Sequence, residues 1–180
     1  RGFLTEHAEQ SAVNEPISTG CETVDRSLGG IERGVVTQLY GPPAAGKTNL
    51  ALSASVQVAA AGGKTLYIDT EGISVDRFEA LAQAAADGDD IETIAGRVIV
   101  SDALDFDEQK EAVRDAGDLA ESIDLIVLDS ATGFYRLERD EEDDGETLRA
   151  VAKQVTQLLA FARRHDLAVL ITNQVYTDPE

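Results

Sequence analysis

The sequence lacks or nearly lacks several residue types, and each shortage narrows the classes of protein that it can encode. Its 180 residues contain no tryptophan, no methionine and one cysteine, Cys21. One cysteine excludes an internal disulfide, and Cys21 is expected to be a small buried apolar residue. No apolar run is long enough to cross a bilayer and no signal-peptide pattern is present, so we expect a soluble, cytoplasmic protein without a membrane partner.

Basic residues are also scarce, because 15 Lys and Arg stand against 34 Asp and Glu and give a net charge of −19. A nucleic-acid-binding protein usually has a basic face, and this composition does not indicate one. Disorder, the other common meaning of high net charge, is excluded by an apolar content of 43%. Few lysines and many carboxylates are typical of a halophilic protein, which works in molar salt with a Debye length of about 3 Å. Net charge then says little about partners.

Strand and helix patterns alternate along the chain. The patterns predict strands at 35–40, 65–69, 97–100, 125–128 and 167–172, and helices at 47–61, after Ser74, at 107–121 and at 146–164, the last with Leu148 on its apolar face. Apolar strands between helices are expected to be buried on both faces, which predicts an α/β fold with a mostly parallel sheet. We expect residues 1–16 to be an arm or linker and residues 17–180 to be one domain.

The stretch GPPAAGKTN follows a predicted strand and opens a predicted helix. Its spacing matches the phosphate-binding loop G-x-x-x-x-G-K-[ST], in which glycines let backbone N–H groups curl around phosphates. Lys47 is placed to reach the β- and γ-phosphates, and Thr48 to place its hydroxyl on Mg²⁺. The residues expected to contact the nucleotide are Gly41, Pro42, Pro43, Ala44, Ala45, Gly46, Lys47, Thr48 and Asn49.

Polar residues follow three further predicted strands, at the edge where parallel sheets bind ligands. Asp129 ends the run DLIVLD, the Walker B arrangement that holds Mg²⁺ directly or through water. Glu71 in LYIDTEG can orient or deprotonate the water that attacks the γ-phosphate, although Asp69 competes for that role. Gln174, with Asn173, can sense the γ-phosphate at the tip of the last strand.

Five motifs, in order, resemble the core of the RecA-family recombinases of archaea and eukaryotes: TGCETVDRSLGGIERG, GPPAAGKT, LYIDTEG, LIVLDSATGFYR and LAVLITNQV. The resemblance covers nearly all of residues 17–180. It implies a P-loop NTPase with a RecA-like core that binds ATP and Mg²⁺, and the family's further C-terminal strands are expected to be missing from this sequence. It also implies that Lys47, Glu71 and Gln174 are catalytic, that Asp129 is the Walker B residue, and that Gln174 couples the γ-phosphate to DNA.

Within this family the motifs are most similar to short archaeal paralogues that lack an N-terminal helical domain. The likeness implies an accessory factor in recombinational repair, with weak ATPase activity, that helps a RadA-type recombinase on single-stranded DNA. Two alternatives stay open, a DNA-dependent strand-exchange recombinase and a KaiC-type signalling ATPase.

Two segments depart from the family pattern. After Asp129, where recombinases bind DNA, Arg136 and Arg139 can meet phosphates, but the acidic run from Asp140 to Asp144 would repel them. In the arm, the sequence FLTE has a glutamate where the family's Phe-x-x-Ala polymerisation element has a small residue. We therefore expect weak or indirect DNA binding, and a monomer or small homo-oligomer instead of a normal filament.

Overall fold

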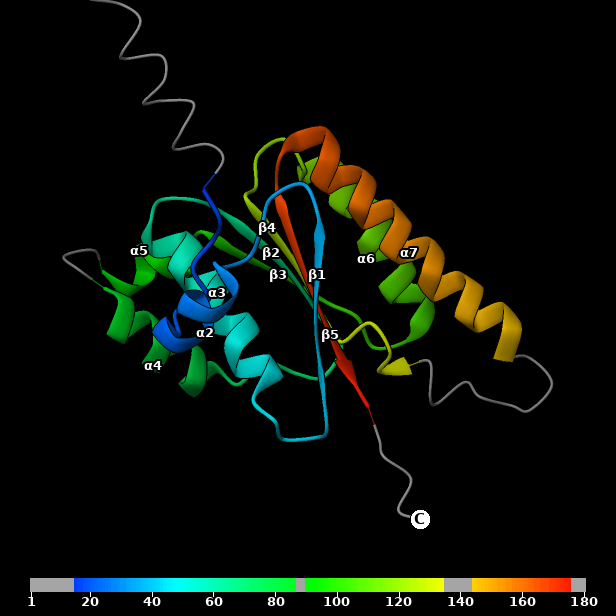
Figure 1. Cartoon of the computed structure of the whole chain (residues 1–180), viewed down its shortest axis with the longest axis horizontal. Coiled ribbons are helices and arrows are strands. Elements are labelled where there is room, and N and C mark those ends of the chain that lie inside the picture. The colour runs from blue at the N-terminus through cyan, green and yellow to red at the C-terminus, as the bar shows by residue number, and fades with distance from the viewer. Residues whose placement is uncertain (1–14, 87–89, 135–143, 176–180) are drawn as a thin grey trace, which may run out of the picture.

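The computed structural model describes residues 15–86, 90–134 and 144–175, and Figure 1 shows how their elements are arranged. The helices are α2 (Glu22–Leu28), α3 (Lys47–Ala60), α4 (Val75–Ala85), α5 (Ile91–Ala95), α6 (Phe106–Leu119) and α7 (Asp144–His165). The strands are β1 (Val36–Gly41), β2 (Thr65–Asp69), β3 (Val98–Asp102), β4 (Leu125–Asp129) and β5 (Ala168–Gln174). The predicted arm, residues 1–16, lies almost wholly outside the described residues, so the predicted domain boundaries stay predictions.

The five strands form one sheet in the order β1-β5-β4-β2-β3, and every pair of neighbours is parallel. This arrangement confirms the predicted α/β class. The central strands β2 and β4 are buried at every position. The expectation that all strands are buried on both faces is wrong for the edge strands β1 and β3, where Val100 is 49% exposed. An edge strand has a neighbour on one side only, so part of its surface stays in contact with water.

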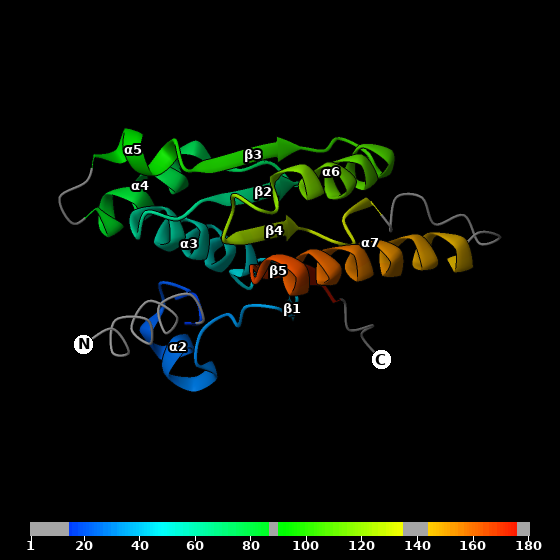
Figure 2. The same ribbon diagram turned by 90° about the horizontal axis from the view of Figure 1, so that it is seen from above.

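Helices cover both faces of the sheet, with α3, α4 and α5 on one side and α6 and α7 on the other (Figures 1 and 2). Alternate residues of each strand point to opposite faces. In β4, for example, Ile126 and Leu128 pack in the core under α6 and α7, whereas Leu125 and Val127 pack in the core under α3. No helix among the described residues is long and apolar enough to cross a membrane.

Three details differ from the sequence-based expectations. Helix α5 was not predicted, because it is only five residues long and its clearest signal is Asp90, whose side chain accepts a hydrogen bond from the Thr93 N–H (2.7 Å). Leu148 is 58% exposed, because the buried contacts of α7 lie in later turns, at Leu158 and Ala162. Cys21 is only half-buried, because it stands just before the first turn of the exposed helix α2.

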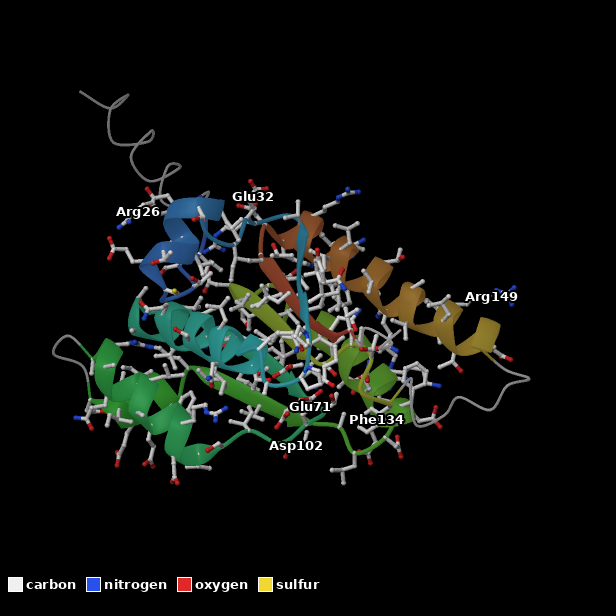
Figure 3. The ribbon with its side chains drawn as sticks, turned by 60° about the horizontal axis from the view of Figure 1, so that its bottom comes forward. Arg26, Glu32, Glu71, Asp102, Phe134 and Arg149 are labelled. Atoms are coloured by element: carbon white, nitrogen blue, oxygen red, sulfur yellow. The ribbon has the colours of Figure 1, made fainter. Side chains whose placement is uncertain are left out.

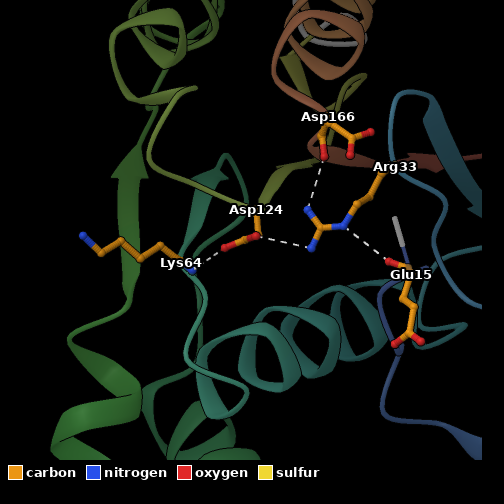
Figure 4. A network of polar contacts seen from close by, with 5 residues as sticks. All are labelled: Glu15, Arg33, Lys64, Asp124 and Asp166. Atoms are coloured by element: carbon orange, nitrogen blue, oxygen red, sulfur yellow. Dashed lines mark hydrogen bonds and ion pairs between the residues drawn. The ribbon is translucent and has the colours of Figure 1, made fainter. Parts of the chain in front are cut away.

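Arg33 joins three segments at the end of the sheet that is opposite to the phosphate loop (Figure 4). Its guanidinium donates to the Asp124 carboxylate (3.2 Å), to the Asp166 carbonyl (3.2 Å) and to the Glu15 carbonyl (3.3 Å). The other oxygen of Asp124 accepts the Lys64 N–H (3.1 Å). These bonds fix the starts of β2, β4 and β5 together, so the opposite ends of these strands have a defined position.

Candidate nucleotide-binding site

Most of the predicted site residues line one cavity of about 290 Å³ at the carboxyl ends of the strands. The residues that line it are Ala44, Ala45, Gly46, Lys47, Thr48, Asn49, Glu71, Arg77, Asp129 and Gln174. Gly41 ends β1 directly opposite Gln174 of β5, and Pro42 and Pro43 follow it in the exposed loop. Figure 3 shows Glu71 at this edge of the sheet, whereas Arg26 and Glu32 lie at the other end. The topology therefore brings together residues that are more than a hundred positions apart in the sequence.

The phosphate loop curls because two of its residues have a left-handed backbone, Ala44 (φ 59°) and Gly46 (φ 85°). Gly46 is also the N-cap of α3, and no described side chain caps this helix end. Its first N–H groups are therefore left for an anion, which the positive end of the helix dipole favours. The Lys47 ammonium donates to the carbonyls of Gly41 (3.1 Å) and Pro42 (2.8 Å), so the positive charge is held inside the loop.

Asp129 is held from both sides at the end of β4. Its side chain is 2% exposed, and its two carboxylate oxygens accept hydrogen bonds from the hydroxyls of Tyr67 (2.7 Å) and Thr172. Burial raises the pKa of Tyr67 well above its ordinary value, and the negative charge of Asp129 raises it further. Tyr67 therefore stays a neutral donor. These two hydroxyls could not be predicted from the sequence, since both lie inside apolar strand runs and carry no motif.

Replacing Tyr67 with phenylalanine is expected to lower the free energy of unfolding at neutral pH by about 1.5–3 kcal/mol, because the Asp129 carboxylate loses a donor. The ordinary pKa of 10.0 applies to the unfolded chain, and the folded pKa is higher. The contribution of the Tyr67 hydroxyl to the free energy of unfolding is thus fully present below pH 10, and it is lost as the pH rises above 10. Urea unfolding at pH 8 and above pH 10 should show a smaller difference at high pH. Tyr40→Phe, at a 73% exposed position, is the control, and a difference independent of pH would contradict this assignment.

Two carboxylates in the turn after β2 have different surroundings. Asp69 is buried, and its oxygens accept the N–H groups of Glu71 (3.0 Å), Gly72 (2.9 Å) and Ile73 (2.6 Å). Glu71 is exposed, and its Oε1 accepts from the Ser130 hydroxyl (2.9 Å) and from the Gln174 amide (3.5 Å). Asp69 therefore shapes the turn, whereas the carboxylate of Glu71 is available to a ligand in the cavity.

The residues present fit a magnesium ion that arrives with a nucleotide. The Thr48 hydroxyl and the Asp129 carboxylate line the same cavity, and both are oxygen ligands of the kind that Mg²⁺ prefers. Among the described residues, no group of three or more His, Cys, Asp or Glu side chains could hold a metal ion. Such a sparse donor set suits Mg²⁺, which keeps waters and takes ligands from substrate phosphates.

Arg77 is a cavity residue that the sequence analysis missed. It lies in the first turn of α4, and its N–H donates to Ser74, the N-cap of that helix (3.4 Å). The available signal was the Ser74 cap, which starts a helix soon after Glu71 and so returns the chain to the same edge. The predicted DNA contacts Arg136 and Arg139 lie outside the described residues.

The fold and the cavity together define a P-loop nucleotide-binding core of the RecA type. A family model described as Rad51 matches residues 10–180. The DNA repair and recombination protein RadB of Halobacterium salinarum is 60% identical over 164 residues, which cover 90% of this chain and 69% of that protein. RadB of Methanococcoides burtonii is 40% identical, over 92% of this chain and 73% of the relative, and RadB of Methanoculleus marisnigri is 41% identical, over 91% and 72%. The chain therefore belongs to the Rad51 family and, within it, to the RadB proteins, which confirms the resemblance.

Proposed function

We propose that this protein is an ATP-binding accessory factor of DNA repair and homologous recombination, with a weak ATPase activity. It would help a RadA-type recombinase to act on single-stranded DNA. The observation that carries the proposal is the cavity, which joins a phosphate loop to Asp129 and Glu71 in a chain 60% identical to a DNA repair and recombination protein. The acid-rich, lysine-poor composition agrees with a halophilic relative and with work in molar salt.

The roles of the cavity residues follow from their positions. The N–H groups of the loop and the Lys47 ammonium bind the phosphates, while Thr48 and Asp129 hold the metal ion. Screening of phosphate charge is the chemistry that Mg²⁺ supplies when it is bound. Glu71 orients the attacking water and accepts its proton. Gln174 donates to Glu71, so a change at the tip of β5 reaches the general base directly.

The contact between Gln174 and Glu71 also favours a second candidate, a DNA-dependent ATPase that exchanges strands itself. In such an enzyme DNA bound beyond β5 would move Gln174 and so control hydrolysis. The two candidates differ in whether DNA changes the rate of ATP turnover.

Steady-state ATP turnover in molar KCl, with and without single-stranded DNA, tests the proposal. Slow turnover that DNA does not change, together with faster strand exchange by a RadA-type recombinase when this protein is added, is the expected result. Strong stimulation by DNA alone, or ATP-dependent filaments, would contradict the accessory role. Monomers or small oligomers in concentration-dependent sedimentation would agree with it.

A further inference from the structure

Helix α7 has an outer face that differs in charge from the rest of the chain. From Thr147 to His165 it contains no Asp or Glu, although 34 of the 180 residues are acidic. Four exposed basic residues, Arg149, Lys153, Arg163 and Arg164, follow each other along this helix. At 100° per residue they fall on one side, opposite the buried residues Gln154, Leu158 and Ala162. We call these four residues the α7 basic stripe.

Composition and helix electrostatics do not explain the α7 basic stripe. The other long acid-free run, Arg33 to Ile68, contains the largely buried helix α3, whereas the stripe faces water. Cations in the last turn suit the helix dipole, which accounts for Arg163 and Arg164. Arg149 and Lys153 lie far from that end, so the dipole gives no reason for them. Within the described part of the chain, no ion pair joins either side chain to a carboxylate.

The stripe's surroundings indicate the chemistry of what it binds. The exposed positions between the basic residues are Ala152, Thr156 and Ala160, which are small. Protein interfaces are held by large aromatic and apolar anchors, and the positions between the basic residues offer none, although Leu148, directly before Arg149, is 58% exposed. Phosphate contacts need only positive charge and hydroxyl groups. From Arg149 to Arg164 the helix rises about 22 Å, the length of about six phosphates along one strand at 3.4 Å each.

Helix α7 is also connected to the nucleotide edge. The Gln109 amide donates to Gln154 of α7 (2.9 Å) and to the carbonyl of Ala131 (3.4 Å), two residues after Asp129. Figure 3 shows Arg149 in the part of α7 that is remote from Arg26 and Glu32. The stripe therefore starts toward the edge of the sheet where the nucleotide cavity lies, and Gln109 joins its helix to the segment after Asp129.

We propose that the α7 basic stripe binds the phosphodiester backbone of a nucleic acid, without reading its sequence. The inference rests on the proposed function in recombination, and its residues are distinct from Arg136 and Arg139, which lie outside the described residues. At molar salt, where the Debye length is about 3 Å, the distant acidic surface repels a nucleic acid only weakly, whereas direct contacts of the stripe with phosphates persist in weakened form. The composition alone does not indicate this basic face, because it depends on how the residues are placed along one helix.

The test compares two pairs of substitutions that change the net charge equally. Arg149→Gln with Lys153→Gln removes half of the stripe. Lys110→Gln with Arg114→Gln removes two cations of α6 that already have partners. Lys110 pairs with Asp107, and Arg114 pairs with Glu111 and Asp115. Fluorescence anisotropy measures binding of a labelled 30-nucleotide single strand, and of its duplex, to the full chain between about 0.5 and 2 M KCl. Circular dichroism and the unfolding midpoint check that each variant is folded.

The stripe variant is expected to bind the single strand about threefold more weakly at the lowest salt, and to lower the slope of log K against log[KCl] by about 1.4, for two lost phosphate contacts. The α6 variant should keep both values, and a loss confined to the duplex would assign the stripe to double-stranded DNA.

Three results would overturn the inference: equal losses in both variants, DNA binding by the stripe variant that matches the wild type, or no binding by the wild type. Loss of binding to a RadA-type recombinase with DNA binding kept would reassign the stripe to an acidic protein. The proposed function is judged separately by ATP binding and turnover, which none of these four substitutions touches.

Discussion

Replacing Lys47 with alanine is expected to lower the affinity for ATP with Mg²⁺ by about a hundredfold or more. A charge-assisted contact to a phosphate contributes about 1.5–3 kcal/mol, and Lys47 is expected to contact two phosphates. In the structure the Lys47 ammonium lies within the loop, in contact with the carbonyls of Gly41 and Pro42. Its position is therefore fixed before a nucleotide binds, and little ordering entropy is lost on binding. Titration of a fluorescent ATP analogue in molar KCl measures the effect.

Lys64→Ala is the matched control for this substitution. Lys64 is an exposed lysine at the opposite end of the sheet, where its backbone N–H, and not its ammonium, contacts Asp124 (Figure 4). The control loses the same charge from the same small set of lysines, and it should bind ATP like the wild type. If Lys47→Ala binds ATP as tightly as Lys64→Ala does, the phosphate-loop assignment is wrong. If both variants weaken binding equally, net charge and not the loop determines affinity.

The fold was predictable because its strands and helices have strong local signals. The runs that became β2 and β4 are apolar, short and bounded by polar residues, and β2 was predicted with its observed ends, Thr65 and Asp69. Ser74 signalled α4 because a serine before an apolar pattern is a frequent N-cap. A parallel sheet then places the end of every strand at one edge, so the clustering of Glu71, Asp129 and Gln174 followed from topology alone.

Contacts across the sheet were not predictable, since they depend on strand order. The order β5-β4-β2 places Tyr67 and Thr172 on either side of Asp129, but the sequence does not state which strands are neighbours. Arg77 was not predicted either, because its approach to the cavity depends on how α4 packs against the rest of the fold. The α7 basic stripe was not predicted, because the net charge does not show how charged residues are distributed over the faces of the protein.

The sequence also left two candidates for the general base, Asp69 and Glu71, and the geometry separates them. Three backbone N–H groups donate to Asp69, so most of its lone pairs hold the turn after β2, and Asp69 does not line the nucleotide cavity. That same turn presents Glu71 to the cavity, with one oxygen held by Ser130. One carboxylate is thus structural and the other is available for chemistry, although both are in the sequence IDTEG.

Glu71→Gln is therefore expected to slow ATP turnover by about a hundredfold or more while ATP affinity changes by less than about threefold, since a general base typically contributes 10²–10⁴ to the rate. The amide keeps the shape of the carboxylate, and its oxygen can still accept the Ser130 hydroxyl, so the turn should not move. Single-turnover hydrolysis with excess protein measures the chemical step apart from product release. ATP-analogue titration of the same sample measures affinity.

Asp102→Asn is the matched control, because Asp102 ends β3 at the same edge, opposite Asp69 of β2, but does not line the nucleotide cavity. It removes one carboxylate charge as Glu71→Gln does, so an equal loss of turnover in both variants would point to the electrostatics of the edge and not to a general base. Unchanged turnover in Glu71→Gln would exclude this residue. Since Asp69 holds the turn and does not line the cavity, water would then have to attack the phosphate without a carboxylate base from this turn.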